Sequence, residues 1–297
     1  KNLISHFQSS LCLHLLVFNS YQSKMSSTGA GYDYSCGTFS PDGRIFQLEY
    51  ATKAVENSGT AIGIRCCDGI VMAVEKPQAS KMLVAGSNRR MFGVNARAGI
   101  AVTGFVADGR QVVNRARDEA RSYKDAYGHN IVPSILANRL ANYVHYFTTH
   151  GALRPFGCAS LVATYDEDLK SHELYMVEPS GLCFRYFGCA AGKGANAAKT
   201  EVEKILQRAG SSGTEITCRE AVKDLARIMY TVRDASRDKP FELEMGWLCE
   251  ETEWKYTAVP TDLVVAADTE GQSVASAQLE GSSGGQEESK GEAMEVS

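Results

Sequence analysis

The stretch Phe39-Ser-Pro-Asp-Gly-Arg-Ile-Phe-Gln-Leu-Glu-Tyr-Ala51 predicts a tight turn followed by a short helix. Pro41 fixes φ near the value needed at the second position of a β-turn, and Gly43 can close that turn without steric cost. After the turn, apolar residues recur at helical spacing on two stripes, Ile45, Leu48 and Val55 on one and Phe46, Tyr50 and Ala54 on the other. A surface helix of a single domain needs one apolar face, so a second stripe raises the question of what covers it.

The composition of the chain is that of a globular protein able to bury a sizeable core. Of its 297 residues, 44% are hydrophobic and 22% are charged, which is ordinary for such proteins. A net charge of −4 gives no electrostatic reason to expect nucleic acid or an anionic membrane surface as a partner. Nine cysteines without a C-x-x-C pair predict neither a disulfide framework nor a zinc site. We therefore expect reduced, buried thiols, as in a cytosolic or nuclear protein.

The two ends of the chain differ from its middle. Residues 1–24 contain a short apolar run that resembles a signal peptide but is interrupted by His14, and Met25 is a plausible start. We therefore expect residues 1–24 to be a translated leader or an artificial extension. Residues 263–297 are predicted to be a disordered acidic tail, because their last 28 residues are rich in Gly, Ser, Gln and Glu and contain no aromatic residue. No run is long and apolar enough to span a membrane.

Strand-like and helix-like segments alternate between these ends. Asp68 and Gly69 mark a hairpin turn between two strands, and Thr217 and Glu220 form a capping box at the start of a helix. Strands are predicted at 61–66, 70–74, 99–104, 159–165, 173–177, 181–186, 241–248 and 254–259, and helices at 112–128, from 133, at 194–209 and from 217. Hairpin-linked strands with paired helices predict an α+β domain in which two antiparallel sheets lie between helix layers.

Three short motifs could carry chemistry, and none meets the requirements. The glycine-rich segment 188–194 has three residues between its glycines and no Ser or Thr after Lys193, so it is not a phosphate loop. His150 and Cys158 could form a nucleophile pair, but nothing indicates a lowered thiol pKa. His129, His145 and His172 show no metal-ligand spacing. The sequence predicts no metal and no cofactor.

Longer motifs resemble the α-type subunits of the proteasome. The stretch 39–51 is similar to their amino-terminal signature, and the resemblance continues in order through Gly59-Thr-Ala-Ile-Gly63, Gly104-Phe-Val-Ala-Asp108, Arg154-Pro-Phe-Gly157 and Ala197-Ala-Lys-Thr-Glu201. It covers about residues 29–262, a single domain. The resemblance implies the four-layer αββα sandwich of N-terminal nucleophile hydrolases, with a gate segment at 25–43 and the α-type domain at 44–262.

The resemblance also implies that this chain does not catalyse peptide cleavage. In the related β-type subunits, a threonine at the amino terminus supplies both the nucleophilic hydroxyl and the basic amine. Gly59 stands at that position here, with Thr60 next to it and an entire segment ahead of it. Glu75 and Arg90 align with the acid and the lysine that assist the threonine, but an arginine stays protonated and cannot readily handle protons. The alternative, an active N-terminal threonine hydrolase, requires cleavage that exposes a nucleophile.

The partners implied by the resemblance answer the question of the second stripe. In the family, seven different α-type chains form a heteroheptameric ring that stacks on a β-type ring and receives regulatory particles or activators, in ATP- and ubiquitin-dependent and independent protein degradation. Head-to-tail contacts of this kind close into rings. One stripe of the helix after Pro41 would then face its own domain and the other a neighbouring chain. The expected location is the cytoplasm and the nucleus, with no nucleic-acid or membrane partner.

Two groups of residues carry over from the family as sites. The gate cluster that supports the open pore corresponds to Tyr32, Asp33, Pro41 and Tyr50, although the arginine that usually follows is Tyr34 here. The pocket that captures the C-terminal carboxylates of activators corresponds to Arg90, Gly104 and Phe105. In addition, Ser289 has an acidic residue three positions later and is a possible phosphorylation site.

Overall fold

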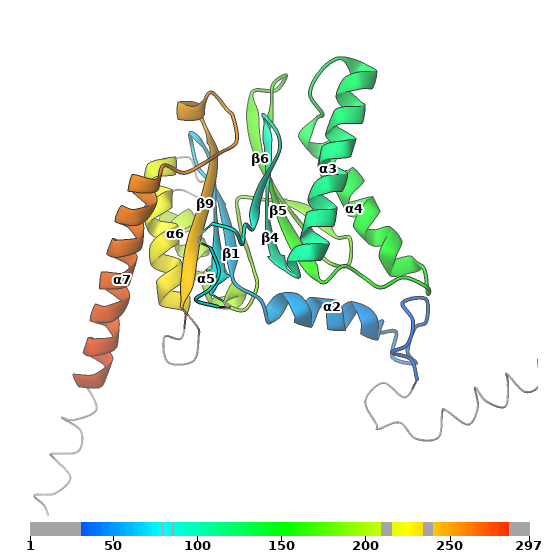
Figure 1. Cartoon of the computed structure of the whole chain (residues 1–297), viewed down its shortest axis with the longest axis horizontal. Helices are drawn as coiled ribbons and strands as arrows, with labels where there is room; N and C mark the ends of the chain where they lie inside the picture. The colour runs from blue at the N-terminus through cyan, green and yellow to red at the C-terminus, as the bar shows by residue number, and fades with distance from the viewer. Residues whose placement is uncertain (1–30, 79, 85, 209–215, 234–239, 285–297) are drawn as a thin grey trace, which may run out of the picture.

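Two antiparallel five-stranded sheets form the centre of the molecule, which we describe from a computed structural model covering residues 31–78, 80–84, 86–208, 216–233 and 240–284 (Figure 1). The first sheet has the order β10-β9-β2-β1-β8 and the second the order β3-β4-β5-β6-β7. The first contains β10 (Thr257–Ala258), β9 (Phe241–Cys249), β2 (Gly69–Pro77), β1 (Ala61–Arg65) and β8 (Gly188–Ala191); the second contains β3 (Met91–Asn95), β4 (Ala98–Gly104), β5 (Cys158–Asp166), β6 (Ser171–Val177) and β7 (Cys183–Tyr186).

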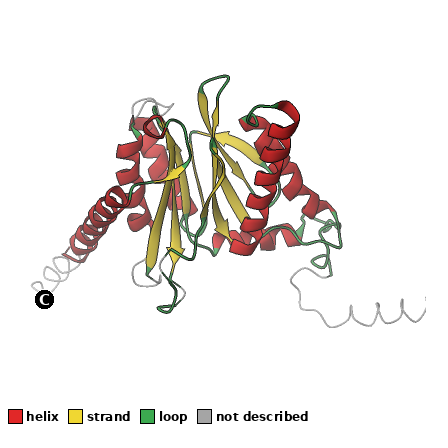
Figure 2. Cartoon of the chain, turned by 45° about the horizontal axis from the view of Figure 1, so that its top comes forward, coloured by secondary structure: helices red, strands yellow, loops and turns green. Residues whose placement is uncertain are grey.

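Helices cover the outer face of each sheet, as Figure 2 shows. α3 (Val106–Tyr127) and α4 (Pro133–Thr149) share an apolar core with the second sheet. α5 (Ala195–Arg208) and α6 (Cys218–Val232) share another with the first sheet, and α7 (Thr261–Gly284) packs against α6. A third core lies between the sheets and includes the fully buried Ile70, Met72, Leu161 and Leu174. The predicted αββα sandwich is therefore confirmed.

The helix that follows Pro41, α2 (Phe46–Glu56), lies at one end of the second sheet, beside β4 and β5 (Figure 1). The turn ahead of it forms as predicted: the Gly43 amide donates to the carbonyl of Ser40 at 2.9 Å, and Gly43 has a φ of +74°. Only Ala51 and Val55 of α2 are buried, and the helix contacts β4 and β5. The remaining apolar side chains of α2 are only partly covered within this chain.

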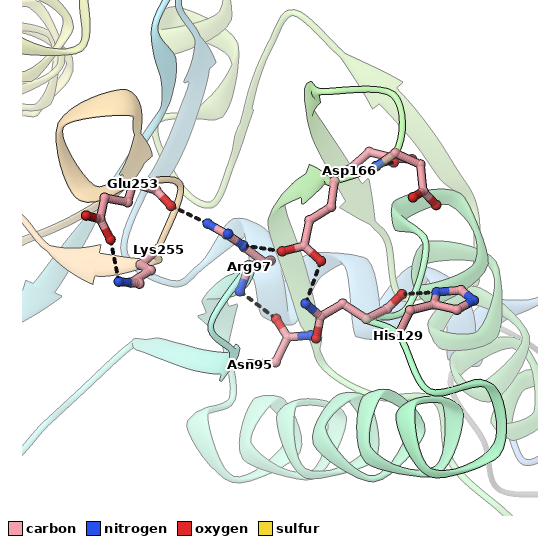
Figure 3. Close-up of polar contacts among 9 residues, drawn as sticks. Asn95, Arg97, His129, Asp166, Glu253 and Lys255 are labelled. Carbon is pink, nitrogen blue, oxygen red and sulfur yellow. Dashed lines mark hydrogen bonds and ion pairs between the residues drawn. The ribbon is translucent and has the colours of Figure 1, made fainter.

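A polar network joins the two sheets at the end opposite α2, as Figure 3 shows. Arg97 Nε donates a hydrogen bond to Glu167 Oε1 at 2.7 Å, and Arg97 Nη1 donates one to the carbonyl of Glu253. Asn130 Nδ2 donates to the other Glu167 oxygen at 2.8 Å. Asp166 is buried, and its Oδ1 accepts hydrogen bonds from the amides of Asp168 and Leu169. Residues 166–169 are therefore a structured turn, which Glu167 anchors to Arg97.

Three segments differ from the sequence-based expectation. β3 was not predicted, and no strand was predicted in the glycine-rich segment 188–194, where β8 lies. The strand expected at 254–259 is reduced to β10, because Glu253 and Trp254 adopt positive φ values of 54° and 58° after a short 3-10 helix, η2 (Glu250–Thr252).

The expectation of a disordered tail is wrong for residues 263–284, which belong to α7. Helix α7 is held by contacts with α6 that its composition does not reveal. Tyr230 on α6 donates to Asp268, and Gly271 lets α7 approach Tyr230 closely. No helix in the described part of the chain is long and apolar enough to cross a membrane.

Candidate functional site

The start of β1 is where a catalytic relative would carry its nucleophile, and it is closed in this chain. Gly59 is buried, and a Cβ atom at this position would lie 2.5 Å from the carbonyl oxygen of Glu75. No side chain therefore fits there without a backbone shift. The peptide chain continues upstream through Ser58, whose amide donates to the carbonyl of Val55 at the end of α2. Residue 59 offers neither a hydroxyl nor a free amine.

Thr60, the nearest hydroxyl on β1, is already engaged. Its side chain is buried, and its Oγ1 accepts the amide of Gly194 at 3.1 Å. Its own amide donates to Oε2 of Glu75 at 3.0 Å. Glu75, the residue aligned with the assisting acid, thus binds a peptide N–H.

Thr103 on β4 fixes the segment ahead of β1. Its hydroxyl donates to the carbonyl of Gly59 and lies 2.6 Å from Oγ of Ser58. On the other side, the amide of Lys193 donates to the carbonyl of Ser58 at 2.9 Å. The backbone at 58–60 is therefore held from both sheets.

The glycine-rich segment 188–194 uses its amides for these same contacts. The amides of Lys193 and Gly194 bind Ser58 and Thr60, and that of Ala195 binds the carbonyl of Gly192. These three amides are therefore already occupied and do not form a free cradle for phosphate.

The thiol of Cys158 is equally unsuited to nucleophilic attack. It is buried, and burial raises its pKa to about 12, so the thiol stays protonated near neutral pH. His150 interacts instead with the carbonyl of Tyr146 and the hydroxyl of Thr149.

Arg90 and Gly104, two residues of the predicted activator pocket, are in direct contact. Arg90 Nη1 donates to the carbonyl of Gly104 at 3.0 Å, and the amide of Arg90 donates to Oε2 of Glu244 at 2.9 Å. Burial lowers the pKa of Arg90, but a guanidinium stays charged near neutral pH. Its Nε is buried without a hydrogen-bond partner among the described residues.

Phe105, the third predicted pocket residue, follows Gly104 at the start of α3 and is 56% exposed. Gly104 has a φ of +104°, and a Cβ there would lie 2.2 Å from the carbonyl of Gly157. The Phe105 ring packs on Gly157, whose carbonyl accepts the Phe105 amide at 2.8 Å. The structure thus places Arg90, Gly104 and Phe105 in one corner.

An ion pair that the sequence did not reveal holds this corner. Arg154 donates to both carboxylate oxygens of Asp108, at 2.7 and 2.8 Å, and the amide of Gly157 donates to the same carboxylate at 2.9 Å. The hydrogen bond from Arg154 lowers the pKa of Asp108. Both residues lie in motifs that carry the family resemblance, but only the fold brings these motifs together.

The residues of the predicted gate cluster lie on both sides of the turn before α2. The side chain of Gln47 on α2 donates to the carbonyl of Asp33, and Oδ1 of Asp33 is buried without a partner among the described residues. Tyr50 stacks on Phe46, with ring centroids 6.5 Å apart. No hydrogen bond or ring contact within the described chain joins Tyr32, Asp33, Pro41 and Tyr50 to one another. Ser289 lies outside the described residues.

A cavity of about 390 Å³ remains between α2, β8 and α5. Its lining includes Glu56, Glu178, Lys193 and Lys199. Neither Gly59 nor Thr60 lines it, so the space beside α2 is not a cleft above a β1 nucleophile.

Comparison with known proteins identifies the class of this protein. Residues 55–248 match the family model for proteasome subunits, and residues 32–54 match the N-terminal signature of the A class of these subunits. The chain belongs to the proteasome subunit family and carries the signature of its α-type members.

The similar curated proteins indicate the subunit type. The chain is 54% identical to the alpha type-3 proteasome subunit of Arabidopsis thaliana over 245 residues, which cover 82% of this chain and 95% of the relative. It is 42% identical to the Drosophila melanogaster protein of the same name over 82% of this chain and 93% of the relative. A Saccharomyces cerevisiae relative, named as a probable alpha type-7 proteasome subunit, is 43% identical over 82% of this chain and 83% of the relative. Segments such as Arg154-Pro-Phe-Gly-Cys158 predict similarity to the α type-3 subunit, and the relatives of that name support this prediction.

Proposed function

We propose that this chain is a non-catalytic subunit of the outer α ring of the 20S proteasome core particle. In that ring it would join other α-type subunits as a heteroheptamer, stack on a β-type ring, and take part in ring assembly, substrate entry control and activator docking. The particle would degrade proteins in the cytoplasm and nucleus, both with and without ATP and ubiquitin, and this chain would support that activity. The α-type signature at residues 32–54 supports this assignment.

The observation that carries the non-catalytic role is the closed start of β1. A side chain at position 59 would overlap the carbonyl of Glu75, and Thr60 uses both its amide and its hydroxyl in internal hydrogen bonds. An N-terminal nucleophile needs a free amine beside its hydroxyl. The alternative, an active threonine hydrolase, would require cleavage before Thr60 and loss of α2. Treatment of the assembled particle with a threonine-directed epoxyketone tests between the two.

The incomplete burial of the apolar side chains of α2 within this chain supports a role in contacts with neighbouring chains of the ring. Only Ala51 and Val55 are buried in this chain, whereas Phe46 and Leu48 are half-buried and Tyr50 is exposed. Apolar side chains left partly exposed on a rigid helix are suited to a neighbouring chain of the ring. Assembly should therefore bury further apolar surface on α2.

Gate support and activator docking would use two different surfaces of this chain. Asp33, tied to α2 through Gln47, has a buried carboxylate oxygen that could accept a bond from the rearranged gate. Arg90 carries its positive charge beside Gly104, where it could pair with an activator carboxylate. Phosphorylation of Ser289 remains a prediction, and phosphopeptide mapping of particles from cells with full tail coverage would contradict it by finding no modified Ser289.

A further inference from the structure

Three thiols and one carboxylate from separate stretches of the chain meet at the end of the first sheet opposite α2. Cys66 follows β1, Asp68 lies in the turn before β2, Cys218 begins α6, and Cys249 ends β9. One ligand atom from each of Cys66, Asp68 and Cys218 lies within 4.8 Å of the other two. The thiols of Cys218 and Cys249 interact with each other. Thiol and carboxylate ligands are therefore assembled in one place.

The spacing of these atoms is close to what a tetrahedral zinc ion requires. Zn–S bonds of about 2.3 Å and Zn–O bonds of about 2.1 Å place neighbouring ligand atoms roughly 3.5–3.8 Å apart. From separations of up to 4.8 Å, the side chains need to close by about 1 Å, which rotation about χ1 can supply. Two or more cysteine sulfurs favour Zn²⁺ over Mg²⁺ or Ca²⁺, which prefer oxygen ligands.

Backbone hydrogen bonds already fix the stretches that carry the ligands. The Cys66 amide donates to the carbonyl of Gly69 at 2.7 Å, and the Cys67 amide donates to the carbonyl of Ile216, just before α6, at 3.0 Å. The Glu250 amide donates to the carbonyl of Asp68 at 2.9 Å, which ties the turn to the end of β9. The fold thus orders the backbone around the ligands before any metal binds, so binding requires little further loss of backbone entropy.

The side chains around the cluster orient its members. Oδ1 of Asp68 accepts the Cys218 amide at 2.7 Å, which leaves the second carboxylate oxygen available to a metal. His172 Nε2 donates to the carbonyl of Cys66 at 2.8 Å. Such outer contacts are typical of metal sites. The amino terminus of α6 also favours the net negative charge of thiolate and carboxylate ligands.

Simple apolar packing explains only part of this arrangement. Cys66, Cys218 and Cys249 belong to the apolar core of the first sheet and are at most 2% exposed. Packing of thiols as small apolar groups does not require a carboxylate oxygen within 4.8 Å of two of them. Asp68 is partly exposed, which leaves a route for an ion to reach the cluster.

We propose that Cys66, Asp68 and Cys218 form a Zn²⁺ site at this end of the first sheet. Binding replaces the thiol protons, which pass to solvent, and involves no change of oxidation state. The sequence predicted no metal site because the site lacks a local cysteine motif: Asp68 and Cys218 are 150 positions apart. Such ligand sets are visible only once the fold brings them together.

Cobalt titration of the full-length chain tests this proposal directly. The protein is purified with a phosphine reductant and without chelator. Its zinc content is measured by inductively coupled plasma mass spectrometry, and the metal-free protein is then titrated with Co²⁺. We expect about one zinc per chain and a cobalt–thiolate charge-transfer band that saturates at about one equivalent. Competition with Zn²⁺ should abolish the band.

Two variants and one control separate ligation from general damage. Asp68→Asn keeps an oxygen for the Cys218 amide but removes the charge, and Cys218→Ser removes a thiolate; each should weaken Co²⁺ binding at least about tenfold. Cys158→Ser alters a buried cysteine in the other helix-covered core and should leave the band unchanged. Absence of the band in the wild-type chain, or the same affinity in Asp68→Asn as in Cys158→Ser, would overturn the site.

Discussion

The amide of Thr60 donates a hydrogen bond of 3.0 Å to Oε2 of Glu75, while the amide of Glu75 donates to the carbonyl of Thr60 at 2.8 Å. The nitrogen of residue 60 is thus a peptide nitrogen built into the β1–β2 pair. Its lone pair is delocalised into the peptide bond, so it cannot act as the general base that an N-terminal nucleophile requires. The closed geometry at residues 59 and 60 therefore supports the proposed non-catalytic role.

Gly59→Ala tests whether the start of β1 has room for a side chain. The added Cβ would lie 2.5 Å from the carbonyl of Glu75, so we expect a loss of about 1–3 kcal/mol in the free energy of unfolding. Urea unfolding of the full-length chain measures it. Gly37→Ala is the matched control, because its Cβ would meet no atom closer than 3.5 Å. Equal stability of the two variants would show that position 59 can accept a side chain.

Asp108→Asn tests the ion pair that holds the pocket corner. Arg154 lowers the pKa of Asp108 in the folded state, so the stabilisation is fully present above the unfolded pKa of about 3.9 and is lost as pH falls through the lower folded pKa. Near neutral pH we expect the variant to be about 1–2 kcal/mol less stable than the wild type. The difference should shrink below about pH 4.

Unfolding midpoints at several pH values check this dependence. Asp125→Asn, which changes an exposed acid on the same helix, should stay within about 0.5 kcal/mol of the wild type throughout. A stability difference for Asp108→Asn that does not vary with pH would contradict an ionised Asp108 as the source of the effect.

The fold was predictable from the sequence wherever a local signal marks an element. The capping box of Thr217 and Glu220 forms as expected, and Gly128 ends α3 in the left-handed conformation with a φ of +79°. β3 carries no comparable signal, because it depends on pairing with β4 and on a bond from Arg117 to the carbonyl of Gly93. α7 likewise depends on contacts with α6 that composition alone does not indicate.

The candidate site was predictable to the extent that family motifs mark single positions. Motif similarity identified Gly59 and grouped Arg90 with Gly104, and the structure joins the latter two by a hydrogen bond. It did not identify the pair of Asp108 and Arg154, which are 46 positions apart. Contacts of that range are set by strand order and register, and a single sequence does not contain them explicitly.

Asp33→Ala tests the proposed gate. The substitution removes the carboxylate, one oxygen of which is buried, but keeps the Asp33 carbonyl that accepts from Gln47. In the assembled particle we expect altered entry of fluorogenic peptides, with unchanged inactivation rates of the β-type sites by a small covalent inhibitor. Asp125→Ala, on the exposed face of α3, is the control. Identical peptide hydrolysis by Asp33→Ala and Asp125→Ala, with and without an activator, would remove Asp33 from the gate.

Arg90→Gln tests the docking pocket. Glutamine can still donate to the carbonyl of Gly104 but has no charge for a carboxylate, so binding of an activator's C-terminal peptide should weaken by about tenfold. Fluorescence anisotropy with particles that carry the variant measures it, and Arg89→Gln, at an exposed neighbouring position, should bind as the wild type does. Unchanged affinity in Arg90→Gln would exclude this guanidinium from carboxylate capture.

Intact-mass analysis of the assembled particle after treatment with a threonine-directed epoxyketone tests the central claim most directly. Gly59 has no hydroxyl, and the Thr60 nitrogen is a hydrogen-bonded peptide amide. The proposed function therefore predicts that this chain retains α2 and gains no mass, while catalytic β-type subunits in the same sample gain one adduct each. A chain that starts at Thr60 and carries one probe adduct would contradict it.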